Sequence, residues 1–347
     1  MEKYQQTLEN LKKFQIFLQD YIDSEENTKE KYDKLQQFIQ DKKFGQEMHD
    51  LKLILHLIST ILKNQHRNSN FISKFEQILK LFGEDIKRYF TNIEIFEIFK
   101  KNKRILLSLL ELKIFSIDEK VATQMTQAKN NFLNITEYFS PELKPFINSE
   151  VYNSLIVNDE KDKDFQAKRL EGENDFTICK LIRNDSVEEF IAYVNKNNIE
   201  LSSKPNSSIY ETNYFLKKQD VNLIEYAAFY GSLKILQYMK TNNVELNSSL
   251  WKFAIHSRNP EMIYTLETSQ IKPENETFKG CLKESIKCHH NEIANYILNN
   301  DLFKDKNKNN YILNIAFRYY NFEFADQEYI KISNICSFVL FFPLFIN

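Results

Sequence analysis

The fold is decided by the stretch Leu223-Ile-Glu-Tyr-Ala-Ala-Phe-Tyr-Gly231-Ser-Leu-Lys-Ile-Leu-Gln-Tyr-Met239, which places two short apolar-periodic segments around one glycine. Comparable units follow at residues 250–266 and 281–297. A helix-turn-helix unit of this size cannot bury its own apolar face, so successive copies must stack on one another. The sequence therefore predicts an all-α helical solenoid, and an interaction scaffold as its default role.

One small residue recurs in the first helix of each unit and sets the repeat frame. Its positions are Ala227, Ala254, Ser285 and Ala316, at intervals of 27, 31 and 31 residues. Small side chains are expected there because the first helices of neighbouring units pack side by side. Gly231 is expected to end the first helix, since glycine adopts the left-handed conformation without steric cost.

Four segments carry a resemblance to a known family. They read Glu171-Gly-Glu-Asn-Asp, Leu223-Ile-Glu-Tyr-Ala-Ala-Phe-Tyr-Gly-Ser, Ser249-Leu-Trp-Lys-Phe-Ala-Ile-His and Cys281-Leu-Lys-Glu-Ser-Ile-Lys-Cys-His-His-Asn-Glu-Ile-Ala. Over residues 171–298 the chain resembles the large trichomonad family of ankyrin-like repeat proteins, which carries a domain of unknown function. The resemblance implies divergent ankyrin repeats and protein binding, and it transfers no catalytic residue.

The chain divides into four regions by composition and pattern. Residues 1–147 read as a helical N-terminal region, and the alignment of residues 103–114 with residues 233–244 indicates a degenerate repeat in at least part of it. Residues 148–175 form a charged connector, residues 176–330 hold the ankyrin-like repeats, and residues 331–347 form an apolar tail. The family pattern fades after about Ala325, as expected of a truncated or frame-shifted family member.

The composition argues against several classes of function. Lys and Arg total 46 against 48 Asp and Glu, so the chain lacks the basic surplus of a nucleic-acid-binding protein. Its five glycines cannot form a phosphate-binding loop. Without a signal peptide, and with only four cysteines, a cytoplasmic location is expected. The basic run at residues 100–104 leaves a nuclear address open, although a solvated helix boundary explains it better.

The predicted binding surface is the concave face of the repeats, where side chains of the first helices meet a protein partner. In the repeat frame it comprises Tyr226, Phe229, Phe253, His256, Glu284 and Lys287. We expect no small-molecule substrate and no enzyme activity, because no polar catalytic constellation can be assembled from six histidines spread over helices. Trp251 occupies a core position of the frame.

Two features of the sequence offer alternatives to this interpretation. Cys281, Cys288, His289 and His290 form a cluster of possible zinc ligands, but a packed helix end explains their spacing better, so no metal or cofactor is expected. The apolar tail has 12 residues from Ile335 to Ile346, well short of the roughly 20 needed to cross a bilayer. A membrane-associated adaptor that uses this tail is the alternative function.

Overall fold

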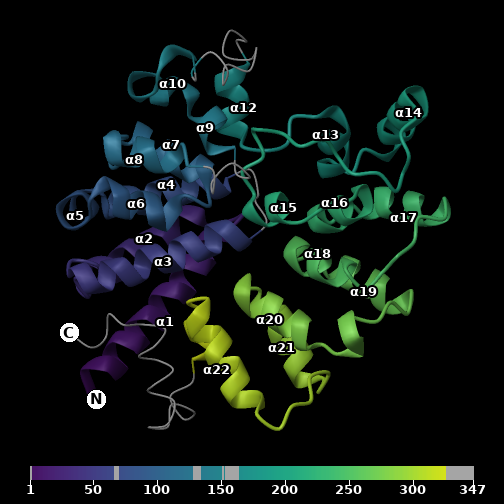
Figure 1. Cartoon of the computed structure of the whole chain (residues 1–347). Coiled ribbons are helices and arrows are strands. Elements are labelled where there is room, and N and C mark those ends of the chain that lie inside the picture. Colours follow the sequence, from purple (N-terminus) through teal and green to yellow (C-terminus); the bar gives the residue numbers. More distant parts are fainter. Residues whose placement is uncertain (1, 66–69, 128–133, 151, 153–163, 326–347) are drawn as a thin grey trace. The chain divides into compact units, whose positions relative to one another are not determined.

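The computed structural model describes residues 2–65, 70–127, 134–150, 152 and 164–325. Every regular element among these residues is an α-helix or a short 3₁₀ helix, and none of the described residues forms a strand (Figure 1). The prediction of an all-α protein is therefore confirmed. The apolar tail at 331–347 and most of the connector centre at 153–163 lie outside the described residues.

The chain forms two compact units, one of residues 1–89 and 273–347 and the other of residues 90–272. The first unit contains α1 (Glu2–Ile22), α2 (Thr28–Asp41), α3 (Met48–Asn64), α4 (Phe71–Leu81), α5 (Gly83–Tyr89), η4 (Glu274–Glu276), α20 (Lys279–Lys287), α21 (Asn291–Asn299), α22 (Lys308–Arg318) and η5 (Phe322–Phe324). The second contains α6 (Asn92–Phe99), α7 (Lys103–Glu111), α8 (Glu119–Met125), α9 (Ile135–Tyr138), α10 (Ser140–Leu143), η2 (Lys144–Phe146), α12 (Phe165–Glu171), α13 (Thr177–Arg183), α14 (Val187–Asn197), α15 (Tyr214–Lys218), α16 (Leu223–Tyr230), α17 (Leu233–Thr241), α18 (Leu250–Ser257) and α19 (Pro260–Thr268).

The first unit joins the beginning of the chain to its last described segment. In α1 the periodic residues Leu11, Phe14 and Leu18 are fully buried, as their helical spacing predicts. The buried side chain of Gln15 donates from Nε2 to Asn321 Oδ1 at 2.8 Å. Its Oε1 accepts from the Phe322 backbone amide at 2.7 Å. This long-range pairing was not predicted, because nothing in the periodicity of residues 1–147 points to a partner 306 residues away.

In the second unit, the basic run at residues 100–104 is partly structural. Lys103 and Arg104 are buried in the first turn of α7. Lys103 Nζ donates to the Ile209 carbonyl at 2.6 Å, and Arg104 Nε donates to the Leu170 carbonyl at 2.7 Å. The expectation of a solvated boundary is therefore wrong for these two side chains. Both side chains instead donate charge-assisted hydrogen bonds to backbone carbonyls that are distant in the sequence.

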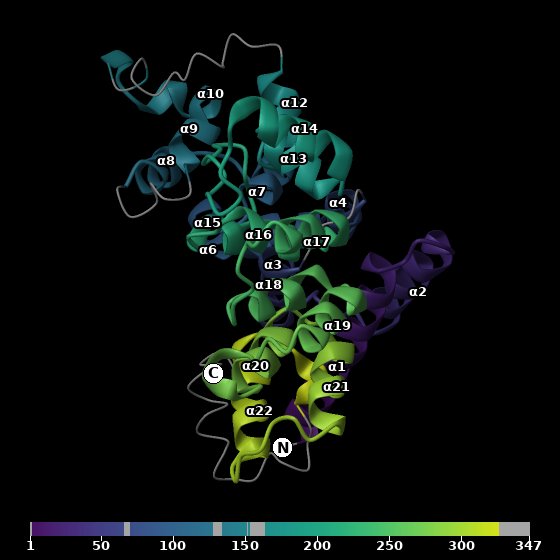
Figure 2. The same ribbon diagram turned by 90° about the vertical axis from the view of Figure 1, so that its right-hand side faces the viewer.

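Three helix pairs follow one another in the second unit: α13 with α14, α16 with α17, and α18 with α19 (Figures 1 and 2). The first helices of these pairs pack in order, α13 on α16 and α16 on α18, while α14 packs on α17. The sequence predicted this local pairing. Trp251 is buried in α18 and donates from Nε1 to the Ile271 carbonyl at 2.8 Å, which confirms its core position.

The second half of the predicted connector is helical. Phe165 and Arg169 of α12 are buried, and the guanidinium carbon of Arg169 lies 5.2 Å from the centre of the Tyr138 ring. Arg169 Nη2 also pairs with Glu142 Oε1 at 2.9 Å. Residues 165–171 therefore belong to the folded second unit and do not form a solvated link.

Candidate functional site

The repeat frame reappears in the structure as a recurring helix end. Ala227, Ala254, Ser285 and Ala316 are all fully buried. The residue four positions after each of them is left-handed, with φ angles of 72°, 54°, 58° and 56°. For Ala227, Ser285 and Ala316, the carbonyl accepts the backbone amide five residues later, at 2.8 to 3.0 Å. This bond is the signature of a Schellman helix end. The same local geometry thus recurs at the predicted positions.

The predicted groove residues of the second unit are covered by the chain itself. Phe215, in the short helix α15, stacks on the His256 ring at a centroid distance of 3.8 Å. It also contacts the rings of Phe229 at 5.8 Å and Phe253 at 5.2 Å. All four side chains are buried. Phe229, Phe253 and His256 therefore do not line an open groove, because the segment before α16 folds back over them.

The other predicted contact residues have different surroundings. Tyr226 is buried, and its hydroxyl accepts a hydrogen bond from Arg183 Nη1 at 3.1 Å. Glu284 and Lys287 belong to α20 in the first unit, where Lys287 Nζ lies 2.5 Å from Glu284 Oε1. This ion pair joins residues three apart on one helix, a spacing that brings their side chains together.

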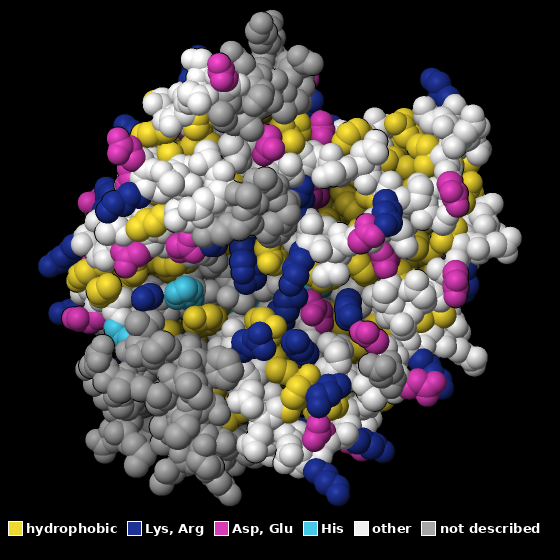
Figure 3. Space-filling model, viewed as in Figure 1, with side chains coloured by type: hydrophobic (Ala, Val, Ile, Leu, Met, Phe, Trp, Pro, Cys, Tyr) yellow, Lys and Arg dark blue, Asp and Glu magenta, His cyan; other side chains and the backbone are white. Residues whose placement is uncertain are grey.

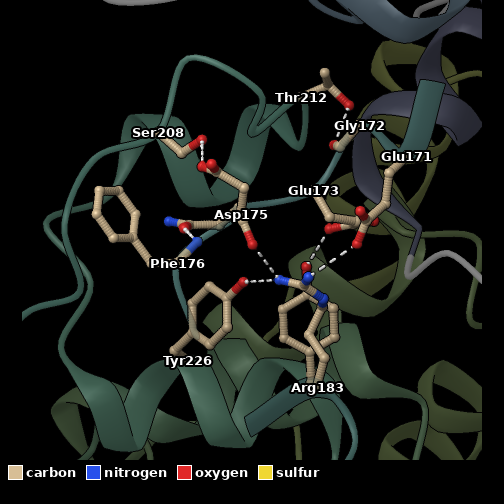
Figure 4. Close-up of polar contacts among 11 residues, drawn as sticks. Glu171, Gly172, Glu173, Asp175, Phe176, Arg183, Ser208, Thr212 and Tyr226 are labelled. Carbon is tan, nitrogen blue, oxygen red and sulfur yellow. Dashed lines mark hydrogen bonds and ion pairs between the residues drawn. The ribbon is translucent and has the colours of Figure 1, made fainter. Parts of the chain in front are cut away.

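Arg183 of α13 is the centre of a polar cluster that the sequence analysis missed (Figure 4). Its Nη1 donates to the Asn174 carbonyl at 2.8 Å, and its Nη2 lies 3.3 Å from Glu171 Oε1. Beside it, the Tyr230 hydroxyl donates to Glu173 Oε2 at 2.6 Å. Residues 171–174 and Arg183 thus link α13 to α16, the first helices of the first two pairs.

The same segment anchors the insertion that leads to α15. The Ser208 hydroxyl donates to Asp175 Oδ1 at 2.7 Å, and Asn174 Nδ2 donates to the Asn206 carbonyl at 2.9 Å. The Gly172 carbonyl accepts both the backbone amide and the hydroxyl of Thr212. Residues 206–212 are thus fixed along their length, which positions the short helix that follows them.

A solvent-accessible cavity of about 370 Å³ lies beneath this insertion, and we refer to it as the α15 cavity. Its walls are residues 204–208 and 219–221 together with the side chains of Asn134, Asn174, Glu211, Leu216, Lys217 and Tyr226. Tyr226 is the one predicted contact residue among them. The cavity lies within the second unit, and its lining combines charged, amide and hydroxyl groups with the apolar residues Leu216 and Val221.

The Cys179 thiol and the Tyr230 hydroxyl, both near Arg183, remain protonated at neutral pH. Burial raises the pKa of the Cys179 thiol to about 12. Burial, reinforced by the Glu173 carboxylate, raises the pKa of Tyr230 well above its ordinary value. A thiol and a phenol in this state donate hydrogen bonds but are poor nucleophiles and bases. The cluster therefore supports the packing of α13 on α16.

The cysteine–histidine cluster within and just after α20 is also buried. Burial raises the pKa of the Cys288 thiol well above its usual range and lowers the pKa of His289 to about 4. His289 is neutral at pH 7, and its Nε2 donates to the Tyr319 carbonyl at 2.9 Å. These features fit the packed helix end expected from the sequence. The absence of bound zinc stays a prediction.

Comparison with protein-family models, with curated proteins and with solved structures found no match. Within the described part of the chain, no helix is both long and apolar enough to cross a membrane. The likeness to ankyrin-like proteins therefore rests on the quoted sequence segments.

Proposed function

We propose that this protein is a non-catalytic scaffold that binds a protein partner through divergent ankyrin-like repeats. The observation that supports the proposal best is the recurrence of one helix pair with a buried small residue and a left-handed turn in the same frame. Repeats of this kind build extended surfaces for protein recognition. On the face seen in Figure 3, acidic and basic side chains are interspersed over α13 to α19, which suits a protein partner better than nucleic acid.

The burial of Phe229, Phe253 and His256 changes how the second unit would present its binding face. We propose that these three side chains hold α15 in place. The insertion at residues 201–222, which is partly exposed, then supplies the contacts to the partner together with Tyr226 at the cavity wall. Lys287, which is partly exposed on α20, is proposed as a further contact, whereas Glu284 is buried and pairs with it.

The test is affinity capture from native cells with the full-length chain, followed by reconstitution with the purified partner. Hydrogen exchange of the complex then maps the amides that the partner protects. The proposal predicts protection within residues 201–222 and along the helix pairs. Protection confined to residues 331–347 would instead favour the adaptor that uses the apolar tail. A chain that retains no partner under conditions where it stays folded would refute the scaffold function.

A further inference from the structure

Two histidines from separate elements of the first unit contact consecutive residues of the segment 319–325, which follows α22. His289, in the turn after α20, donates from Nε2 to the Tyr319 carbonyl at 2.9 Å. His56 of α3 stacks on the Tyr320 ring, with the ring centroids 5.5 Å apart and the planes inclined by 7°. The segment therefore contacts two groups that take up protons as the pH falls.

The remaining contacts of the segment fix it on α1. Gln15 Oε1 accepts the Phe322 backbone amide at 2.7 Å, and Gln15 Nε2 donates to Asn321 Oδ1 at 2.8 Å. The side chains of Phe322 and Ala325 are buried. The backbone of Tyr320 is left-handed, with φ of 56°, a conformation that residues other than glycine keep when their surroundings hold them in it. The docked conformation thus depends on its contacts, and we refer to residues 319–325 as the latch.

The surroundings of His289 disfavour a charged imidazole. The side chain is 2% exposed, and its Nδ1 has no hydrogen-bond partner among the described residues. Protonation would place an N–H on Nδ1, and this donor would be buried without an acceptor. Burial accordingly lowers the pKa of His289 from 6.5 to about 4. Because Tyr319 contacts this ring, release of the latch would admit water to it and raise its proton affinity.

His56 responds to release of the latch in the same direction. Burial, reinforced by the charges of Lys52 and Lys63 on the same helix, lowers the pKa of His56 from 6.5 to about 4. The Tyr320 ring that stacks on it is neutral, because burial raises the pKa of Tyr320 to about 12. Departure of this ring exposes the imidazole, whereas the two lysines stay on α3 and keep their smaller effect. Loss of the stack therefore raises the proton affinity of His56.

Glu323, which belongs to the latch, acts in the opposite direction. Burial raises its pKa, and the carboxylates of Glu292 and Asp20 reinforce this shift. Asn291 and Lys12 oppose it. A carboxyl group whose pKa is raised in the docked state strengthens docking as the pH falls. One carboxyl group thus opposes two imidazoles, and the net response of the latch to acid is release.

We propose that the latch is an acid-sensitive device, which docks on α1 and α3 near neutral pH and is released when His56 and His289 become charged. Release exposes the apolar side chains of Phe322 and Ala325, which are buried in the docked state. A histidine whose pKa rises from about 4 to 6.5 on release increases the equilibrium constant for opening about 20-fold between pH 7 and pH 5. The proposal is independent of the scaffold function.

The experiment measures hydrogen exchange of single amides in the full-length protein at pH 7 and pH 5, corrected for the intrinsic exchange rate at each pH. The Phe322 amide reports on docking, because its acceptor is the Gln15 side chain. We expect its protection to fall at least about tenfold from pH 7 to pH 5. The amide of Ile78, a fully buried residue of α4, reports on unfolding of the whole first unit, and its protection should change less than about threefold.

Two substitutions remove the titrating groups and keep the packing. His56→Phe retains a ring that stacks on Tyr320. His289→Asn retains a hydrogen-bond donor, and Asn tolerates the left-handed backbone at this position, where φ is 58°. In the double variant the latch amide should be protected equally at the two pH values. His49→Asn is the matched control, because it removes another histidine of α3 and should leave the full pH response.

The single variants keep the test decisive if the double variant does not fold. Each should then lose about half of the pH response on a logarithmic scale, since the two histidines contribute similarly. A full pH response in both single variants would overturn the proposal, and so would an equal effect of His49→Asn. A parallel loss of protection at Phe322 and Ile78 would also overturn it, because acid would then unfold the whole unit and not release the latch.

Discussion

Replacement of Phe215 by alanine tests whether α15 is held by the predicted groove residues. Phe215 is 5% exposed and contacts three rings, those of Phe229, Phe253 and His256. Truncation of a buried phenylalanine to alanine lowers the free energy of unfolding by about 3–5 kcal/mol. Because Phe215→Ala also removes three ring contacts, we expect a loss of about 4 kcal/mol. With an m-value of about 2 kcal/mol/M, a loss of about 4 kcal/mol lowers the urea midpoint of the second unit by about 2 M.

The assay exploits the single tryptophan of the chain. Trp251 lies in α18, so its fluorescence reports on the second unit, while far-ultraviolet circular dichroism follows both units. Tyr264→Ala is the matched control, because this aromatic side chain of α19 is 66% exposed and its loss should cost less than about 0.5 kcal/mol. If Phe215→Ala shifts the fluorescence midpoint no more than Tyr264→Ala does, then α15 does not cover the groove as described.

Three further predictions concern the repeat frame, the 171–175 segment and acid stability. Ala227→Leu should destabilise the second unit by about 1–3 kcal/mol, because it overpacks a fully buried site; an unchanged urea midpoint would contradict the frame. Gly172→Ala should lower the free energy of unfolding by more than about 1 kcal/mol in calorimetry, because φ is 71° and a Cβ would lie 3.1 Å from Thr212 Oγ1. An unchanged free energy of unfolding would contradict the close contact between Gly172 and Thr212. Burial lowers the pKa of His289 from 6.5 to about 4, so the unfolded state binds the proton more readily than the folded state. The stability that the neutral imidazole contributes above pH 6.5 is therefore lost as the pH falls to 4. The stability advantage of the wild type over His289→Asn should therefore shrink by about 3 kcal/mol across that interval in urea titrations, and a pH-independent difference would refute the buried neutral imidazole.

The sequence was sufficient to predict those features that depend on local periodicity. The buried face of α1 follows from the spacing of Leu11, Phe14 and Leu18, and the fully buried Ala227 and Ala254 follow from the repeat frame. The left-handed turn at Gly231 was also predictable, since glycine favours that conformation. Equivalent left-handed turns lie at Arg258 and His289, where the sequence has no glycine to indicate them.

Features that depend on distant contacts could not be predicted. The insertion before α16 contained a local signal, because Asn213 caps a helix whose Phe215 and Leu216 are apolar. The signal shows that these side chains need burial, but it does not show that they cover Phe229 and His256. The anchoring of Asn206 and Ser208 by residues 174 and 175 is similarly invisible in a single sequence, since it joins positions more than thirty residues apart.

The pairing of Gln15 with Asn321 and Phe322 has a consequence for the order in which the protein folds during synthesis. The two segments are separated by 306 residues, so the first helix leaves the ribosome long before its partner exists. At a translation rate of about 5–20 residues per second, this interval lasts about 15–60 s. The second unit is continuous in sequence from 90 to 272, and it can therefore fold while the first unit is still incomplete. Throughout that time α1 can pack on α2 and α4 but not on η5, so the surroundings of Gln15 are completed only when the last described segment has been made.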